Sequence, residues 1–391
     1  MRSEPGKVEH LYVHVPFCAA KCNYCAFYSE PDSAAKMGGY VDAVLKELER
    51  LCFAKAPLAE IPTTAGEAPT LQCIQLEPTT IFFGGGTPSM LPVPLMRRLL
   101  QGTYALGHSG PVSEWTIECN PSTVSTEKAK MFHEFGVNRI SMGVQALEDV
   151  LLQTIGRVHS VKSAVESYEK LRRAGFENIN LDLMFGLPGQ TVEQWQTTLR
   201  RAIALQPEHI SIYCLILEED TEFWSLFQKG LLKPNEEQEL AMYEFAIEIL
   251  TAAGYRQYEI SNFAKPGREC AHNIAYWEGK DYLGLGPSAC STIGDRRWQN
   301  VPAIDGYIQA ISDRQSAISF QETVTPELRA SERAAFGMRM IDGVPAELVR
   351  GRWDKQIAAL LSAELVQWRN DRLQPTRRGV LFADEVAAEF V

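Results

Sequence analysis

Long apolar runs are missing from this sequence. No uninterrupted stretch approaches the ~20 apolar residues that a helix needs to span a bilayer, so we expect no transmembrane segment. The opening residues, Met1 to Lys7, are polar and lack the apolar core of a secretory signal. Both absences favour a globular protein of the cytoplasm.

Positive charge is also scarce, because 38 Lys and Arg face 49 Asp and Glu and leave a net charge of −11. Phosphate binding requires a basic face, so we expect no nucleic-acid partner. A secreted disulfide framework is missing too. Of nine cysteines, three lie close together near the start and six are scattered. A reducing compartment fits such thiols.

The three clustered cysteines, Cys18, Cys22 and Cys25, have the spacing C-x3-C-x2-C. Thiolates are soft ligands that suit iron–sulfur clusters. Three of them on one loop suit a [4Fe-4S] cluster and leave its fourth iron open to an outside ligand. Zinc is an alternative, with His14 as fourth ligand, and three unrelated thiols are another. Because His14 lies in a predicted strand, where it serves as an inward polar contact, we favour the cluster.

Short β-rich segments alternate with amphipathic helical ones over the first 217 residues. The predicted strands are Leu11–Val15, Thr79–Phe83, Trp115–Cys119, Arg139–Gly143, Ile179–Leu183 and His209–Tyr213. The predicted helices are Met37–Phe53, Val93–Gly102, Thr126–Phe135, Val161–Ala174 and Val192–Leu205. This alternation predicts an α/β fold, a partial (β/α)6 barrel of the TIM type, with function at the carboxyl ends of its strands.

Three domains are expected. Residues 1–235 form the barrel core, 236–320 a connecting region, and 321–391 a small, mainly helical carboxyl-terminal domain. The connecting region begins with a helix over Glu236–Ala253 and continues as an ordered loop over Gly267–Thr292. The last domain is predicted to contain helices over Ser331–Ile341 and Pro345–Leu361 and a strand over Leu373–Pro375.

Polar and glycine-rich motifs follow the predicted strands. Gly84 to Pro88 could bring backbone close to a ligand, although a tight turn would explain a lone glycine triplet. Arg157 carries a guanidinium fork that suits a carboxylate. Glu118, Gln145 and Asp182 also fall at strand ends. Each could be a structural polar residue by itself, but together, in barrel order, they favour ligand binding.

The cysteine motif and this order of motifs resemble the radical S-adenosylmethionine (SAM) enzymes. In that family the amino and carboxylate groups of SAM chelate the open iron. One electron then cleaves the sulfonium to methionine and a 5′-deoxyadenosyl radical, and flavodoxin or ferredoxin would donate it. The positions that match the family's SAM contacts are Tyr24, Gly85, Gly86, Thr87, Glu118, Gln145, Arg157 and Asp182.

The resemblance implies a role for each position. Tyr24 would pack on the adenine, and the loop through Thr87 would meet the amino group. Glu118 would contact the ribose or the amino group, and Arg157 would lie near the carboxylate. Tyr12, which opens the motif Y-x-H-x-P-F-C, is a further candidate for cofactor binding.

From Tyr12 to Phe382 the chain resembles the oxygen-independent coproporphyrinogen III oxidase-like branch of that family. The true oxidase carries a fourth cysteine where this chain has Phe27, and a longer segment before the cluster motif than the 17 residues found here. Both departures put decarboxylase activity in doubt. Whether the chain is an enzyme therefore stays open, with the oxidase reaction and radical methyl transfer as alternatives.

The motif H-N-x-x-Y-W links the chain to the HemW-type heme chaperones of this branch. It reads His272, Asn273, Tyr276 and Trp277 here. An imidazole can ligate heme iron, and the two aromatic rings could flank the macrocycle. The alternative is that the polar pair fixes a loop while the rings fill core. The resemblance implies heme as a cofactor and a heme-accepting protein, respiratory or membrane-associated, as partner.

Overall fold

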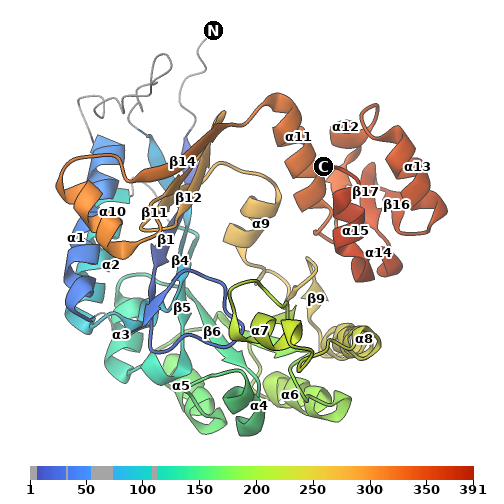
Figure 1. Ribbon diagram of the computed structural model, residues 1–391, viewed down its shortest axis with the longest axis horizontal. Coiled ribbons are helices and arrows are strands. Elements are labelled where there is room, and N and C mark those ends of the chain that lie inside the picture. Colours follow the sequence, from blue (N-terminus) through green and yellow to red (C-terminus); the bar gives the residue numbers. More distant parts are fainter. Residues whose placement is uncertain (1–6, 32–33, 54–73, 108–111) are drawn as a thin grey trace.

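A nine-stranded sheet forms the centre of the molecule in a computed structural model that describes residues 7–31, 34–53, 74–107 and 112–391. Its strand order is β11-β1-β4-β5-β6-β7-β8-β10-β9 (Figure 1). The predicted strands are present as β1 (Val8–Val15), β4 (Leu76–Gly85), β5 (Glu114–Cys119), β6 (Arg139–Gln145), β7 (Ile179–Phe185) and β8 (His209–Cys214). All six are parallel, which confirms the predicted fold class.

Strand β1 illustrates how the sequence sets the two faces of the sheet. Leu11, Val13 and Val15 are fully buried in the main core, whereas Tyr12 and His14 between them line a large cavity. Successive side chains of a strand point to opposite faces, so the apolar half packs under helices and the polar half faces inward. Each such apolar burial contributes roughly 1.5–3 kcal/mol relative to exposure.

Helices cover the apolar face of the sheet (Figure 1). They are α1 (Ala34–Phe53), α2 (Val93–Gly107), α3 (Thr126–Glu134), α4 (Asp149–Thr154), α5 (Val161–Arg173) and α6 (Val192–Ala204), with α7 (Glu222–Gln228) and α8 (Glu236–Ala252) beyond β8. Side-chain caps at Ser125, Ser160 and Thr191 fix the starts of α3, α5 and α6. None of the helices in the described ranges is long and apolar enough to cross a membrane.

The sheet stays open, with β11 and β9 at its edges. Strand β10 (Asn262–Ala264) runs antiparallel to β8, and β9 (Arg256–Gln257) follows it. Strand β11 (Leu283–Leu285) pairs in parallel with β1 and so adds a seventh parallel strand that the sequence did not predict. A three-residue strand carries too little alternation for a periodicity argument.

The expected loop over Gly267–Thr292 is wrong in part. It contains the helix α9 (Ala271–Trp277), β11 and most of β12 (Cys290–Ile293). Strands β12, β13 (Arg296–Asn300) and β14 (Ile318–Thr323) form a separate antiparallel sheet, with α10 (Ile304–Ser312) beside α1. These elements are short, and the strands they pair with are distant in the sequence. The local composition therefore predicted a loop.

The carboxyl-terminal region has its own apolar core. Helix α11 (Pro326–Gly337) is followed by β15 (Val344–Pro345), α12 (Ala346–Val349), α13 (Asp354–Ser362), β16 (Val366–Arg369), β17 (Arg372–Pro375), α14 (Arg377–Leu381) and α15 (Ala383–Ala388). The single helix predicted over Pro345–Leu361 is therefore two, separated near Gly351, whose φ of +76° ends helical geometry.

Candidate functional site

The three cysteines lie on one loop at the carboxyl end of β1. Cys18 ends the short strand β2 (Phe17–Cys18), which pairs with β3 (Glu30–Pro31), and Cys22 and Cys25 follow in the connecting turn. All three are half-buried free thiols, and all three line one cavity of about 610 Å³. Asn23 anchors the loop, because its backbone N–H donates to the Ile155 carbonyl at 3.2 Å.

The donor set fits an iron–sulfur cluster better than zinc. Three soft thiols share one cavity, and His14 contacts Tyr12 Oη at 3.1 Å and the Tyr28 carbonyl at 3.3 Å instead of joining them. Within the described ranges, no three His, Cys, Asp or Glu side chains already form a compact metal site. Phe27, at the position of the oxidase's fourth cysteine, is 69% exposed.

The glycine loop after β4 packs directly against the cysteine loop. The Gly86 N–H donates to the Val15 carbonyl at 2.9 Å, and the Thr87 N–H donates to the Phe17 carbonyl at 2.7 Å. An added Cβ at Gly86 would lie 2.8 Å from the Phe17 oxygen. Gly85 has a φ of +104°, where its missing Cβ leaves room for the His14 ring. Gly86 is therefore required by close backbone approach, and Gly85 by its positive φ and by the neighbouring His14 ring.

Two carboxyl groups, those of Glu118 and Asp182, line the cysteine cavity beside this glycine loop. Glu118, on β5, accepts from the Gly85 N–H at 3.2 Å. Burial, together with the nearby Asp182, raises the pKa of Glu118 to about 8. Burial also raises the pKa of Asp182, although Ser141 and Asn180 donate to its oxygens at 3.0 and 2.7 Å. Such a pair can accept hydrogen bonds from a ligand amine or hydroxyl.

Gln145 and Arg157 line the same cavity on its β6 side. Gln145 has a φ of +66°, a conformation that costs non-glycine residues about 1–3 kcal/mol, and the β6–β7 register shifts beside it. Arg157 donates to the Gly143 carbonyl at 2.6 Å and approaches the Cys22 sulfur at 3.6 Å. Its Nε has no hydrogen-bond partner among the described residues. The two side chains are thus aimed into the cavity.

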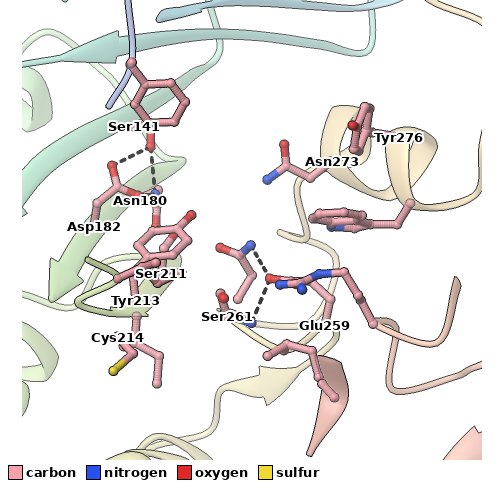
Figure 2. A pocket seen from close by; sticks show the side chains of 18 of the residues that line it. Ser141, Asn180, Asp182, Ser211, Tyr213, Cys214, Glu259, Ser261, Asn273 and Tyr276 are labelled. Carbon is pink, nitrogen blue, oxygen red and sulfur yellow. Dashed lines mark hydrogen bonds between the residues drawn. The ribbon is translucent and has the colours of Figure 1, made fainter. Parts of the chain in front are cut away.

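A second, larger cavity of about 1190 Å³ adjoins the first. Gly85, Glu118 and Asp182 line both. Figure 2 shows Ser141, Asn180 and Asp182 on the sheet side of this larger cavity, facing Asn273 and Tyr276 across it, with Glu259 below these two in the view. Tyr12 lies here and not in the cysteine cavity, stacked on Phe82 with ring centroids 6.2 Å apart.

His272 stands at the start of α9, on the wall of the larger cavity. Its Nδ1 lies 2.8 Å from Thr80 Oγ1, which also lies 2.9 Å from His10 Nδ1. Burial, together with His10 and Arg139, lowers the pKa of His272 to about 3. The ring is therefore neutral near pH 7. Its Nε2 has no hydrogen-bond partner in the described part of the chain and remains free to bind a ligand.

The other motif residues have mixed roles. Tyr276 is 41% exposed and stacks on Phe336 of α11 with ring centroids 5.8 Å apart. Trp277 lies edge-on to Tyr276, and the Arg339 guanidinium covers its ring at 4.8 Å. Asn273 lines the cavity beside them. The motif thus joins α9 to α11 and also presents polar and aromatic groups to the cavity.

Comparison with known proteins agrees with this arrangement. A model of the Radical SAM superfamily matches residues 12–202. The heme chaperone HemW of Bacillus subtilis is 37% identical over 394 residues, covering 98% of this chain and 99% of that protein. The heme chaperone HemW of Escherichia coli is 38% identical over 280 residues, covering 71% and 68% respectively. The chain belongs to the HemW family of the radical SAM superfamily.

A solved structure of a radical SAM enzyme shares the fold of this HemW-family chain. The coproporphyrinogen III oxidase (HemN) from Escherichia coli, a radical SAM enzyme, has a TM-score of 0.81 and 25% identity. The match covers 99% of this chain and 90% of that one, so it includes the carboxyl-terminal region. Superfamily membership implies a [4Fe-4S] cluster and SAM. The individual ligand residues of this HemW-family chain remain predictions.

Sequence reasoning missed a buried polar network in this HemW-family chain. Asn180 Oδ1 accepts from Ser211 at 3.1 Å and lies 2.7 Å from His209 Nδ1, whose Nε2 lies 2.9 Å from Tyr258 Oη. The signal was present, since polar residues alternate with apolar ones at Asn180 and Asp182 on β7 and at His209 and Ser211 on β8. Their alternation marks the inner face of the barrel.

Proposed function

We propose that this protein binds heme in the larger cavity and carries it to an acceptor protein, with a [4Fe-4S] cluster and SAM in the smaller cavity. The observation that carries the proposal is the shared wall of the two cavities. Gly85, Glu118 and Asp182 face both, and His272 opens onto the larger one. The residues proposed for SAM and the histidine proposed for heme iron would therefore face adjoining cavities.

On the cluster side, Cys18, Cys22 and Cys25 would hold three irons. The cluster would supply one electron to SAM at its open iron. Gly85 and Gly86 let backbone approach the nucleotide, Glu118 accepts from its polar groups, and Tyr24, Gln145 and Arg157 complete the lining.

On the heme side, His272 would offer Nε2 to the iron. A neutral imidazole whose other nitrogen is held by a hydrogen bond is the usual form of a histidine metal ligand. The cavity volume of about 1190 Å³ exceeds the roughly 300–1,000 Å³ of ordinary ligand sites and leaves room for a large planar ligand. Tyr276 and Trp277 line this cavity and would contact the macrocycle with the parts of their rings that face it.

Three further parts of the proposal concern the cell. The acceptor would be a heme-binding protein, because the HemW relatives are named heme chaperones, and the family resemblance favours a respiratory or membrane-associated one. A flavodoxin or ferredoxin would reduce the cluster. The protein would act in the cytoplasm, where a reducing environment protects thiolates and cluster.

Heme titration tests the proposal directly. Anaerobically reconstituted protein is titrated with hemin, and the Soret band is followed. We expect a shifted Soret band with about one equivalent bound, and a weaker, altered band for His272→Ala. His133→Ala is the control, because His133 is exposed on α3, away from the cavity. Wild-type protein that gives no Soret shift contradicts heme binding.

The second candidate is decarboxylation of coproporphyrinogen III, which the structural likeness to HemN favours. Phe27 in place of a fourth cysteine argues against it. Anaerobic incubation of reconstituted protein with SAM and coproporphyrinogen III decides between the two. Stoichiometric CO₂ release supports the oxidase, and a methylated product would indicate radical methyl transfer.

A further inference from the structure

The larger cavity has a strongly uneven charge. Its lining includes seven carboxylic acids, two arginines and no lysine. Tetrapyrroles carry carboxylates, two in heme and four in its coproporphyrin counterpart, and each needs a donor once it leaves water. The two arginines are therefore the strongest donors that this lining could offer to a ligand carboxylate.

Arg139 is poorly placed for that task. It is 2% exposed, on β6, and its charge already interacts with Glu114 and Asp182. Both acids are fixed by other bonds, Glu114 by the Ala271 N–H at 2.9 Å and Asp182 by Ser141. Its Nε also lacks a hydrogen-bond partner among the described residues, but a guanidinium this deeply buried beside two carboxylates exposes too little of itself to meet the carboxylate of a ligand.

Arg339 is differently placed, after α11 at the junction with the carboxyl-terminal region. Its backbone is fixed, because the Ile260 N–H donates to the Arg339 carbonyl at 3.1 Å. Its guanidinium covers the Trp277 ring at 4.8 Å, and its Nε is buried with no hydrogen-bond partner among the described residues. Among the described residues it forms a single ion pair, to Asp384 at 3.4 Å, and this pair is weak because that carboxylate is 92% exposed.

Glu259 is the competing acid on this wall. One of its oxygens accepts from the Ser261 N–H at 3.0 Å and from Asn262, and the other has no partner in the described residues. Burial raises the pKa of Glu259 to about 7, so the carboxyl is partly protonated at neutral pH. A partly neutral Glu259 leaves much of the Arg339 charge for a ligand.

We propose that Arg339 anchors one carboxylate of the bound tetrapyrrole, and that the acid-rich remainder of the cavity selects against tetrapyrroles with more carboxylates. This inference rests on the proposed heme-binding function. It makes Arg339 a specificity-determining residue, because a planar guanidinium already stacked on Trp277 pairs with a carboxylate at little entropic cost. The ligand's other carboxylates would have to reach solvent.

Three probes test the anchor: hemin, hemin dimethyl ester, which has no free carboxylate, and coprohemin, which has four. Soret titrations use full-length, cluster-reconstituted protein. Wild type should bind hemin about tenfold more tightly than either the ester or coprohemin. A tenfold difference in affinity corresponds to one hydrogen-bonded charge pair. Arg339→Leu should lose that tenfold preference over the ester, and Arg339→Lys should regain part of it.

Arg350→Leu is a matched control. Arg350 covers the Trp368 ring at 4.6 Å and pairs with exposed Asp371 at 3.3 Å, but it does not line the cavity. It should bind all three probes as wild type does. If Arg339→Leu fails to fold, the wild-type comparison of hemin with its ester still decides the matter.

The outcomes separate the two claims. Wild type that binds none of the probes overturns the proposed function. Wild type that binds hemin and its ester equally, or an Arg339→Leu variant that weakens both equally, overturns the anchor and leaves heme binding intact. Coprohemin bound as tightly as hemin overturns the selection by charge.

Discussion

The two adjoining cavities are built in different ways. The smaller one is made by loops that follow consecutive parallel strands, and its cysteines and glycines are held by backbone contacts such as Gly86 to Val15. The larger one is enclosed by inward side chains of the sheet, by α9, and by the carboxyl-terminal helices α14 and α15. The smaller cavity thus depends on local backbone geometry, and the larger one on distant elements meeting correctly.

The sharpest way to separate the cavities is to remove one cysteine. Cys22→Ser should abolish most cluster assembly, because only two of three thiolates remain. Iron and sulfide analysis after anaerobic reconstitution measures the loss. Hemin binding in the other cavity should persist. Cys290→Ser, in the larger cavity, is the control and should assemble a normal cluster.

Gly86→Ala should damage the smaller cavity through the backbone. Its Cβ would lie 2.8 Å from the Phe17 oxygen and 2.9 Å from the Val15 oxygen, and neither atom can move alone. We expect a loss of about 1–3 kcal/mol in unfolding free energy, measured in urea, and weaker SAM binding.

Gly38→Ala provides the contrast for this variant. Gly38 lies in α1 with nothing within 4 Å of an added Cβ. Alanine should stabilise the helix there by about 0.5–1 kcal/mol. If both substitutions changed the unfolding free energy equally, close packing around Gly86 would not explain why glycine stands there.

Thr80→Val tests whether a hydrogen bond to His272 orients this histidine in the larger cavity. The hydroxyl lies 2.8 Å from His272 Nδ1, so its loss should leave that nitrogen unpaired and the imidazole poorly oriented. We expect hemin affinity to fall about tenfold, with SAM binding unchanged. Thr80→Ser keeps the hydroxyl and should bind hemin nearly as wild type does. Unchanged affinity in Thr80→Val would mean that Thr80 does not orient the ligand.

The wall shared by both cavities should respond to pH. The folded-state pKa of Glu118, about 8, lies above the ordinary value of 4.5, so the folded state holds the proton more tightly. The contribution of Glu118 to the unfolding free energy of the cluster-free protein should therefore be greatest below pH 4.5. It should fall by up to about 1.4 kcal/mol per pH unit as pH rises to 8.

Glu118→Gln should reduce this slope without abolishing it. Burial also raises the pKa of Glu47 and of Glu259 to about 7, so these groups act in the same direction. Urea unfolding at several pH values between 5 and 8.5 gives the slope for each protein. Identical slopes would contradict the raised pKa of Glu118.

The same contrast explains how far the sequence could be interpreted. Strands β1 and β4 to β8 are six to ten residues long, and their alternation predicted both the strands and the residues at their ends. The cysteine cavity follows from that order. The contact between His272 and Thr80 joins residues 192 positions apart in the chain. No local sequence pattern predicts such a contact. Arg339 was missed for the same reason.

Short elements account for the remaining errors. Helix α9 and strand β11 have seven and three residues, which is too few for a periodic pattern. The helix predicted over Pro345–Leu361 failed at Gly351, because one glycine with positive φ interrupts an otherwise continuous apolar pattern. Glycine inside a helical pattern was the available warning.

The late arrival of β11 has a consequence for protein synthesis. The six consecutive parallel strands β1 and β4 to β8 have all been translated by residue 214, whereas α9 and β11 follow after residue 270. Nascent chains fold from the amino terminus, so β1 waits as an unprotected edge until Leu283–Leu285 is translated. The strands behind the cysteine cavity can thus pair before the elements that enclose the larger cavity have been made.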